Sequence, residues 1–189
     1  GKGRGAEALV RWEHPEQGRV PPGRFIELAE RTGAIVPLGR WVLETACAEA
    51  ARWWRELGAA SPFVSVNVSP IQLVVPGWVE DVRRVLDATG LPPARLQLEI
   101  TEQAVLRDEA AALDALTQLD EVGVHLALDD FGTGYSSFAW LRQLPVHSLK
   151  IDGSFVHGLR YPAADPVDRS IVRAMIGMAH ALSLEVTAE

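Results

Sequence analysis

Short apolar runs alternate along this chain with longer stretches in which apolar residues recur three and four positions apart. The longer pattern is typical of amphipathic helices, and it is clearest at 166–182, where Ile171, Met175 and Leu182 share one face. The short runs have the length and composition of strands. We predict six strands, at 7–12, 63–68, 96–100, 124–129, 146–151 and 184–189. We predict further helices at 23–32, 38–57 and 108–121.

Polar side chains accompany the predicted strands, and we assign them to strand ends. They are Glu7, Asn67, Glu99, Asp129, Lys150 and Glu189. Successive members are 60, 32, 30, 21 and 39 residues apart, and one strand–helix–strand unit takes about 30 residues. Most steps therefore correspond to one unit, and the 60-residue step is expected to hold an insertion.

Alternation of strands and helices predicts parallel strands joined by crossover helices. A parallel barrel gathers the carboxyl ends of its strands at one mouth, where catalysis occurs. An open doubly wound sheet is the alternative, but it seldom brings so many strand ends to one place. We therefore favour a (β/α)8 barrel. Because a barrel needs eight strands, we expect residues 1–189 to be a single barrel domain that is incomplete at both ends.

Composition narrows the class of protein. With 48% hydrophobic residues, the chain has enough apolar material for a core, which argues against disorder. The net charge of −7 argues against binding to DNA or RNA, and excess carboxylate fits divalent cations as well as simple solubility. The single cysteine, Cys47, excludes an internal disulfide and a cysteine-built zinc site. Without a membrane-length apolar stretch or a signal peptide, we expect a cytoplasmic domain.

Six motifs occur in a fixed order along the chain. They are GAEALVRWEHP at 5–15, VNVSP at 66–70, LEITE at 98–102, DDFGTGYSS at 129–137, LKID at 149–152 and AE at 188–189. In this order they resemble the EAL family of cyclic di-GMP phosphodiesterases. The resemblance implies a TIM-like barrel with one antiparallel strand, and hydrolysis of cyclic di-GMP to linear pGpG with two Mg²⁺ or Mn²⁺ ions. It also implies a homodimer and a covalently linked regulatory or GGDEF-type domain. Attachment of a larger protein to the membrane stays open.

The predicted strand ends supply oxygen ligands of the kind that Mg²⁺ and Mn²⁺ prefer. Glu7, Asn67, Glu99 and Asp129 are enough for a first metal ion completed by water, and Asp130 could join Asp129 around a second. Two such ions can activate a water and stabilise the leaving oxygen. A lone acid at a strand end is more often a helix cap or half of an ion pair. Five such residues in this order are poorly explained by caps and ion pairs alone.

Further roles follow from the resemblance. Lys150 stands in an apolar strand and is expected to contact the catalytic water or a metal-bound carboxylate; a lysine that reaches out to solvent is the alternative. Glu189 is implied as a metal-contacting acid/base. Arg11 is implied to contact substrate phosphate, although a surface pair with Glu13 is the alternative. Asp152 is expected on the same side of a continuing strand as Lys150, near the substrate.

A glycine-rich loop follows the paired aspartates. Its residues are Phe131, Gly132, Thr133, Gly134, Tyr135, Ser136 and Ser137. In the family this loop stabilises the metal site and links it to the dimer surface, and a glutamate like Glu102 anchors it. An ordinary glycine-rich turn is the alternative.

Two functions remain in competition. One is an active phosphodiesterase, with Lys150, Glu189, Asp130 and Glu102 as the catalytic set. The other is an inactive cyclic di-GMP receptor, of a kind that usually lacks a metal-binding acid or has a degraded loop. Every position that can be inspected is filled here, which favours the enzyme. A purely structural interaction module would not need this set of ligands.

Overall fold

The structure is a computed structural model that describes residues 5–133, 138–157, 159 and 166–188. Its main feature is a six-stranded sheet in the order β1-β4-β5-β6-β7-β8, in which every pair of neighbours is parallel. The strands are β1 Gly5–Ala8, β4 Phe63–Val68, β5 Leu96–Thr101, β6 His125–Phe131, β7 Ser148–Ile151 and β8 Glu185–Ala188. Five of the six predicted strands are thus confirmed with shifts at their ends, whereas the predicted strand 7–12 is confirmed only at Glu7 and Ala8, within β1.

The order of the strands identifies the architecture. It follows the sequence without reversal, whereas a doubly wound sheet reverses its order at a switch point. The sheet is therefore an arc of a TIM-like barrel, and the doubly wound alternative is wrong. The antiparallel strand implied by the resemblance is not among the six strands of this described sheet and stays a prediction.

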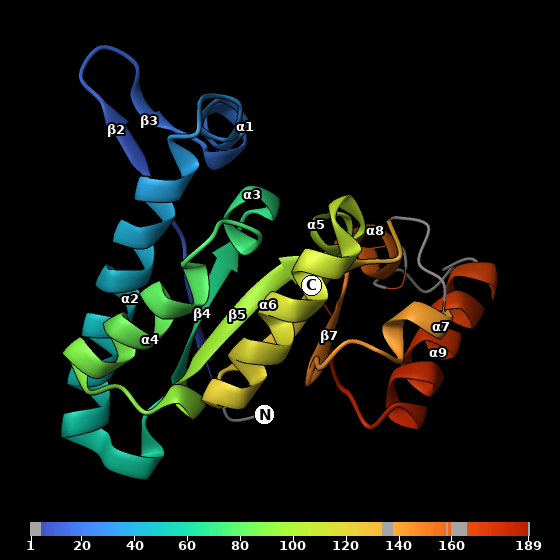
Figure 1. Ribbon diagram of the computed structural model, residues 1–189. Coiled ribbons are helices and arrows are strands. Elements are labelled where there is room, and N and C mark those ends of the chain that lie inside the picture. The colour runs from blue at the N-terminus through green and yellow to red at the C-terminus, as the bar shows by residue number, and fades with distance from the viewer. Residues whose placement is uncertain (1–4, 134–137, 158, 160–165, 189) are drawn as a thin grey trace.

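Helices follow the strands in the expected alternation (Figure 1). The longer ones are α1 Pro22–Thr32, α2 Ile35–Leu57, α4 Trp78–Thr89, α6 Glu109–Val122 and α9 Pro166–Ala181. The shorter ones are α3 Pro70–Leu73, α5 Glu102–Arg107, α7 Phe138–Leu141 and α8 Gly153–His157, with 3-10 turns η1 Gly58–Ala60 and η2 Pro93–Arg95. All predicted helices are confirmed. Within the described ranges, no helix combines the length and the apolar character needed to cross a bilayer.

The insertion expected in the first long step is a hairpin followed by a helix. Strand β1 ends at Ala8 rather than continuing to Trp12. Strands β2 Trp12–His14 and β3 Gly18–Val20 then pair antiparallel, and Figure 1 shows this hairpin beside α1, away from the main sheet. Gly18 has φ +67°, which suits its place directly after the turn. The predicted strand 7–12 therefore combines two separate elements.

Side chains on the two faces of the sheet differ in character. The apolar face is buried among the helices and includes Val64, Val66, Leu96, Leu98, Ile100, Leu126, Leu128, Leu149 and Ile151. The alternate positions, which point to the opposite face, include Ser65, Asn67, Gln97, Glu99, Ala127, Asp129, Ser148 and Lys150. In a closed barrel this second face is the interior. The polar side chains are thus gathered on one side of the sheet, which we call the polar face.

Candidate functional site

Strand register brings the polar side chains of different motifs together. Asn67 is the Cα partner of Glu99, and Thr101 is the partner of Asp129. Partners on neighbouring parallel strands point to the same face, and the strands lie about 4.8 Å apart. All of these residues lie toward the carboxyl ends of their strands. The sheet therefore aligns residues that are 28 and 32 positions apart in the sequence at one edge of the polar face.

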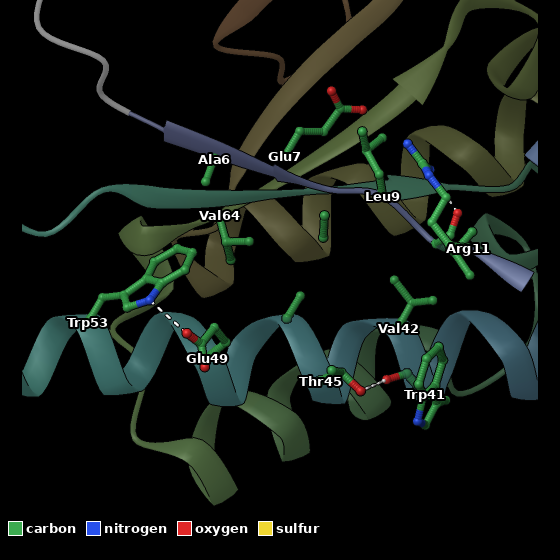
Figure 2. A pocket seen from close by; sticks show the side chains of 13 residues that line it. Ala6, Glu7, Leu9, Arg11, Trp41, Val42, Thr45, Glu49, Trp53 and Val64 are labelled. Carbon is green, nitrogen blue, oxygen red and sulfur yellow. Dashed lines mark hydrogen bonds between the residues drawn. The ribbon is translucent and has the colours of Figure 1, made fainter. Parts of the chain in front are cut away.

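Glu7 and Asn67 form the first contact of the site. Asn67 Nδ2 donates a hydrogen bond of 2.8 Å to Glu7 Oε1. Figure 2 shows Glu7 on the side of β1 that faces away from α2, whereas Ala6 and Val64 point toward that helix. Because the amide nitrogen of Asn67 serves Glu7, its carbonyl oxygen is the atom suited to a cation. This orientation fits the expected neutral oxygen ligand.

Lys150 joins two acids in the second contact. Its ammonium lies 2.9 Å from Glu99 Oε2 and 3.2 Å from Asp129 Oδ2. Lys150 and Asp129 are each 7% exposed and Glu99 is 3% exposed. A buried charge is costly unless it is paired and hydrogen-bonded, and each of the three meets this condition. The alternative of a lysine that reaches out to solvent is therefore wrong.

The oxygen donors fit a hard divalent cation by their chemistry. Three carboxylates and one amide oxygen are the ligand types of Mg²⁺ and Mn²⁺ sites. Among the described residues, no three His, Cys, Asp or Glu side chains already stand together as a metal-binding group. The donors form two neighbouring groups, Glu7 with Asn67 and Glu99 with Asp129.

The backbone turns sharply after Asp129. Asp130 has φ +53°, a left-handed conformation that is uncommon for residues other than glycine. Its amide donates to Asp129 Oδ1 at 2.9 Å, and the register between β6 and β7 shifts between Leu128 and Phe131. Strained conformations of this kind concentrate at functional sites. The turn gives the two aspartates separate surroundings, as separate roles would require.

Gly132 continues this turn and is required there. Its φ is +101°, and an added Cβ would lie 2.7 Å from Met175 Cε and 2.8 Å from Phe155 Cε2. Its amide donates to Glu102 Oε2 at 3.3 Å. Glu102 is fully buried, and its other oxygen, Oε1, has no hydrogen-bond partner within the described part of the chain. The described start of the loop is thus tied to Glu102, as expected; Gly134, Tyr135, Ser136 and Ser137 lie outside the described residues.

Three remaining predicted residues lie apart from these contacts. Arg11 donates to the Val10 carbonyl at 2.9 Å, and Glu13 pairs with Arg19 instead, so the suggested Arg11–Glu13 pair is wrong. Strand β7 ends at Ile151, so the strand does not continue through Asp152. Asp152 Oδ1 accepts from the Ser154 amide at 2.9 Å, and hydrogen bonding by Ser154 lowers the pKa of Asp152. Glu189 lies outside the described residues.

Sequence reasoning missed Gln97. Its Nε2 donates to Glu99 Oε1 at 3.1 Å and to Ser65 Oγ at 3.0 Å. The available signal was its place two residues before Glu99, which puts it on the same face of β5. Both oxygens of Glu99 therefore accept hydrogen bonds, one from Gln97 and one from Lys150.

Two cavities of about 290 Å³ each adjoin β1. One lies between β1 and α2 and is lined by Val42, Trp53 and Val64 (Figure 2). The other reaches the strand ends, where Asn67 and Thr101 line it together with apolar residues of the insertion and α2. The first cavity also touches Glu7 and Arg11, and the second reaches Asn67 and Thr101 at the edge of the polar face.

Comparison with known proteins places this geometry in a family. The family model described as EAL domain matches residues 1–189. The chain is 45% identical, over 98% of its length, to a bifunctional diguanylate cyclase/cyclic di-GMP phosphodiesterase, MucR, of Pseudomonas aeruginosa. It spans 26% of that relative's length.

Solved structures of EAL proteins superpose closely on this chain. The complex of the PaMucR phosphodiesterase with c-di-GMP superposes with a TM-score of 0.90 at 43% identity, covering 98% of this chain and 73% of that one. The EAL enzyme Bd1971, bound to cAMP and cyclic di-GMP, gives 0.88 at 32% identity, covering 98% of this chain and 50% of that one. The chain therefore belongs to the EAL domain family.

Proposed function

We propose that this chain is the catalytic domain of a phosphodiesterase that hydrolyses cyclic di-GMP to linear pGpG with two Mg²⁺ or Mn²⁺ ions. The observation that carries the proposal is the contact of the buried Lys150 with Glu99 and Asp129, beside Glu7 and Asn67. A protein that only bound the nucleotide would have no need for a buried lysine held by two buried acids beside two further oxygen donors.

The proposed metal-binding residues are the oxygen donors of the site. They are Glu7, Asn67, Glu99, Asp129, Asp130 and Glu189. When bound, a pair of such ions would lower the pKa of a water and stabilise the attacking and leaving oxygens. Hydrolysis forms a bond from the water oxygen to phosphorus and breaks the bond to a ribose 3′ oxygen, which leaves with a proton.

The other proposed roles belong to side chains that hold or move protons. We propose that the ammonium of Lys150 would donate a hydrogen bond to the attacking water, and its contacts with Glu99 and Asp129 support this role. Asp130 and Glu189 are proposed as the acids and bases of proton transfer. Glu102 is proposed to support the turn at Asp130 by holding the Gly132 amide, without touching the reacting atoms itself.

The substrate is proposed to enter along the cavity that reaches the strand ends. Its lining includes Leu9, Ile35 and Asn67, which combines apolar walls with a polar end. Such walls suit the flat face of a nucleobase. Arg11 stands on the segment just beyond β1 and could pair with a phosphate, and Asp152 lies just past the end of β7.

Assembly and context form a separate proposal. We infer a cytoplasmic homodimer whose interface borders the loop 129–137 and helix α8, with a regulatory or GGDEF-type domain linked in the full-length protein. Support for the linked domain alone comes from MucR, a bifunctional relative of which this chain spans 26%. Light scattering over a concentration series tests it: a strict monomer with full activity would remove the link between dimerisation and catalysis.

One experiment separates the enzyme from the inactive receptor. Purified protein is incubated with cyclic di-GMP and Mg²⁺, and pGpG is followed by chromatography with and without EDTA. Metal-dependent pGpG formation supports the enzyme. Binding of cyclic di-GMP in Ca²⁺ without turnover in Mg²⁺ or Mn²⁺ would support the receptor instead.

A further inference from the structure

We propose that Gln97 is a positioning residue that sets the orientation of the Glu99 carboxylate for cation binding. This inference rests on the proposed function, because it concerns the same site. Gln97 belongs to no catalytic motif identified in the sequence and does not touch the reacting groups. It acts through Glu99 alone.

The hydrogen bonds of Gln97 form a short chain across two strands. Its Nε2 donates to Glu99 Oε1 at 3.1 Å and to Ser65 Oγ at 3.0 Å, which uses both protons of the amide. Ser65 is the Cα partner of Gln97 in the neighbouring strand and is 4% exposed. The amide is therefore anchored by a buried hydroxyl on one side and holds the carboxylate on the other.

Glu99 has a freedom that this contact removes. The last torsion of a glutamate side chain is broad, so the carboxylate plane turns easily unless something holds it. Lys150 holds Oε2 at 2.9 Å and Gln97 holds Oε1, so the plane is fixed from two directions. Gln97 lies two residues before Glu99 on the same face of β5, so its amide holds the carboxylate from the side nearer the start of the strand. Hydrogen bonds of this kind to a ligating side chain typically change metal affinity about 10- to 100-fold.

The test uses Gln97→Met, which keeps the length of the side chain and removes the donor. Mn²⁺ binding is measured by calorimetry on substrate-free protein, together with the Mn²⁺ dependence of cyclic di-GMP hydrolysis. We expect Mn²⁺ affinity to fall about 10-fold or more, with KM for the nucleotide unchanged and kcat largely recovered at saturating Mn²⁺. The matched control is Gln118→Met, which removes a 2.8 Å bond from a glutamine to the Asp114 carboxylate on the surface of α6 and should change neither property.

A second variant guards against a simple loss of structure. Ser65→Ala should weaken Mn²⁺ binding less than Gln97→Met, and the double variant should match Gln97→Met alone, because Ser65 would act only through Gln97. Mn²⁺ affinity of Gln97→Met within threefold of wild type, or additive effects in the double variant, would overturn the inference. If wild-type protein neither binds Mn²⁺ nor hydrolyses cyclic di-GMP, the proposed function itself fails, and the positioning role fails with it.

Discussion

The ammonium of Lys150 lies 2.9 Å from Glu99 Oε2 and so ties β7 to β5 across the strand between them. Both side chains are almost fully buried, and Asp129 on the intervening β6 shares the same ammonium. Removing one partner of a buried ion pair leaves an uncompensated charge and typically costs about 3–5 kcal/mol. Substitutions here must therefore be chosen so that loss of function can be separated from loss of fold.

Glu99→Gln and Asp129→Asn keep the size of each side chain and remove an anionic oxygen. We expect turnover with saturating Mg²⁺ to fall below about a tenth of the wild-type rate, since even indirect contacts to a metal ligand are worth 10- to 100-fold. Circular dichroism should show an intact fold. The control is Glu121→Gln on the exposed side of α6, which should keep full activity. A tenth or more of the rate in either site variant would refute the ligand assignment.

Gly132→Ala tests the turn that follows the paired aspartates. At φ +101° a side chain is strained, and the new methyl would also press on Met175 and Phe155. We expect a loss of about 1–3 kcal/mol in the free energy of unfolding, and lower activity because the contact to Glu102 is disturbed. Urea denaturation measures the free energy of unfolding. Gly177→Ala, in the open interior of α9, should instead stabilise by up to about 1 kcal/mol. If Gly132→Ala had the stability and activity of the wild type, the backbone at this turn would not need glycine.

The sequence supported the sheet well because its strands carry strong apolar runs. Buried runs such as Leu96–Thr101 and His125–Phe131 alternate with polar positions, and this pattern depends only on neighbours in the chain. The strand-end acids were found in the same way. Lys150 was singled out because it stands in an apolar strand, and its partners Glu99 and Asp129 belonged to the predicted set.

The errors concern relationships that a local pattern does not contain. The run 7–12 looks continuous, but Trp12 pairs with Val20 in a hairpin rather than with the main sheet. Asp152 lies beyond β7 because the Ser154 amide draws its carboxylate into a turn. Gln97 contacts Ser65 through strand register, which requires knowing which strands are neighbours. Pairing partners, rather than element types, were what the sequence could not supply.

The lowered pKa of His125 predicts how the stability of the fold changes with pH. Burial is the larger cause that lowers its pKa below 6.5, and the nearby His147, whose ring centroid is 4.7 Å away, adds to it; Glu185 and Asp120 act in the opposite direction. Because the unfolded chain binds this proton more readily, stability is full above pH 6.5 and falls as pH decreases through and below that value. His125→Gln should make the fall shallower in urea titrations between pH 7.5 and about 5. His180→Gln, on the exposed side of α9, is the control. An unchanged pH profile for His125→Gln would contradict this assignment.

The thiol of Cys47 should not react with thiol reagents in the folded protein. Its side chain is fully buried in α2, and burial raises its pKa from 9.0 to about 12. At pH 8 the reactive thiolate is then about a thousandfold scarcer than in an exposed thiol, before access is considered. Ellman's reagent should therefore label one thiol only when the protein is unfolded, at a rate limited by unfolding. Rapid labelling without denaturant would show that α2 opens readily.

Lys150 gives the sharpest test of the site because its ammonium occupies a small, buried space between two carboxylates. The ammonium reaches Glu99 and Asp129 together at 2.9 and 3.2 Å and is only 7% exposed, so the bulkier planar guanidinium of arginine cannot take the same position. Lys150→Arg should therefore lose nearly as much turnover as Lys150→Ala.

The pair of variants also separates chemistry from binding. Affinity for cyclic di-GMP, measured in Ca²⁺ to block turnover, should change little in either one, because Lys150 is expected to act on the chemical step. Thermal denaturation must accompany both variants, since Lys150→Ala leaves two buried carboxylates without their cation and should unfold more easily. Lys150→Arg restores the charge, so retention of most of the wild-type rate would mean that Lys150 supplies charge alone, and its role in holding the attacking water would be lost.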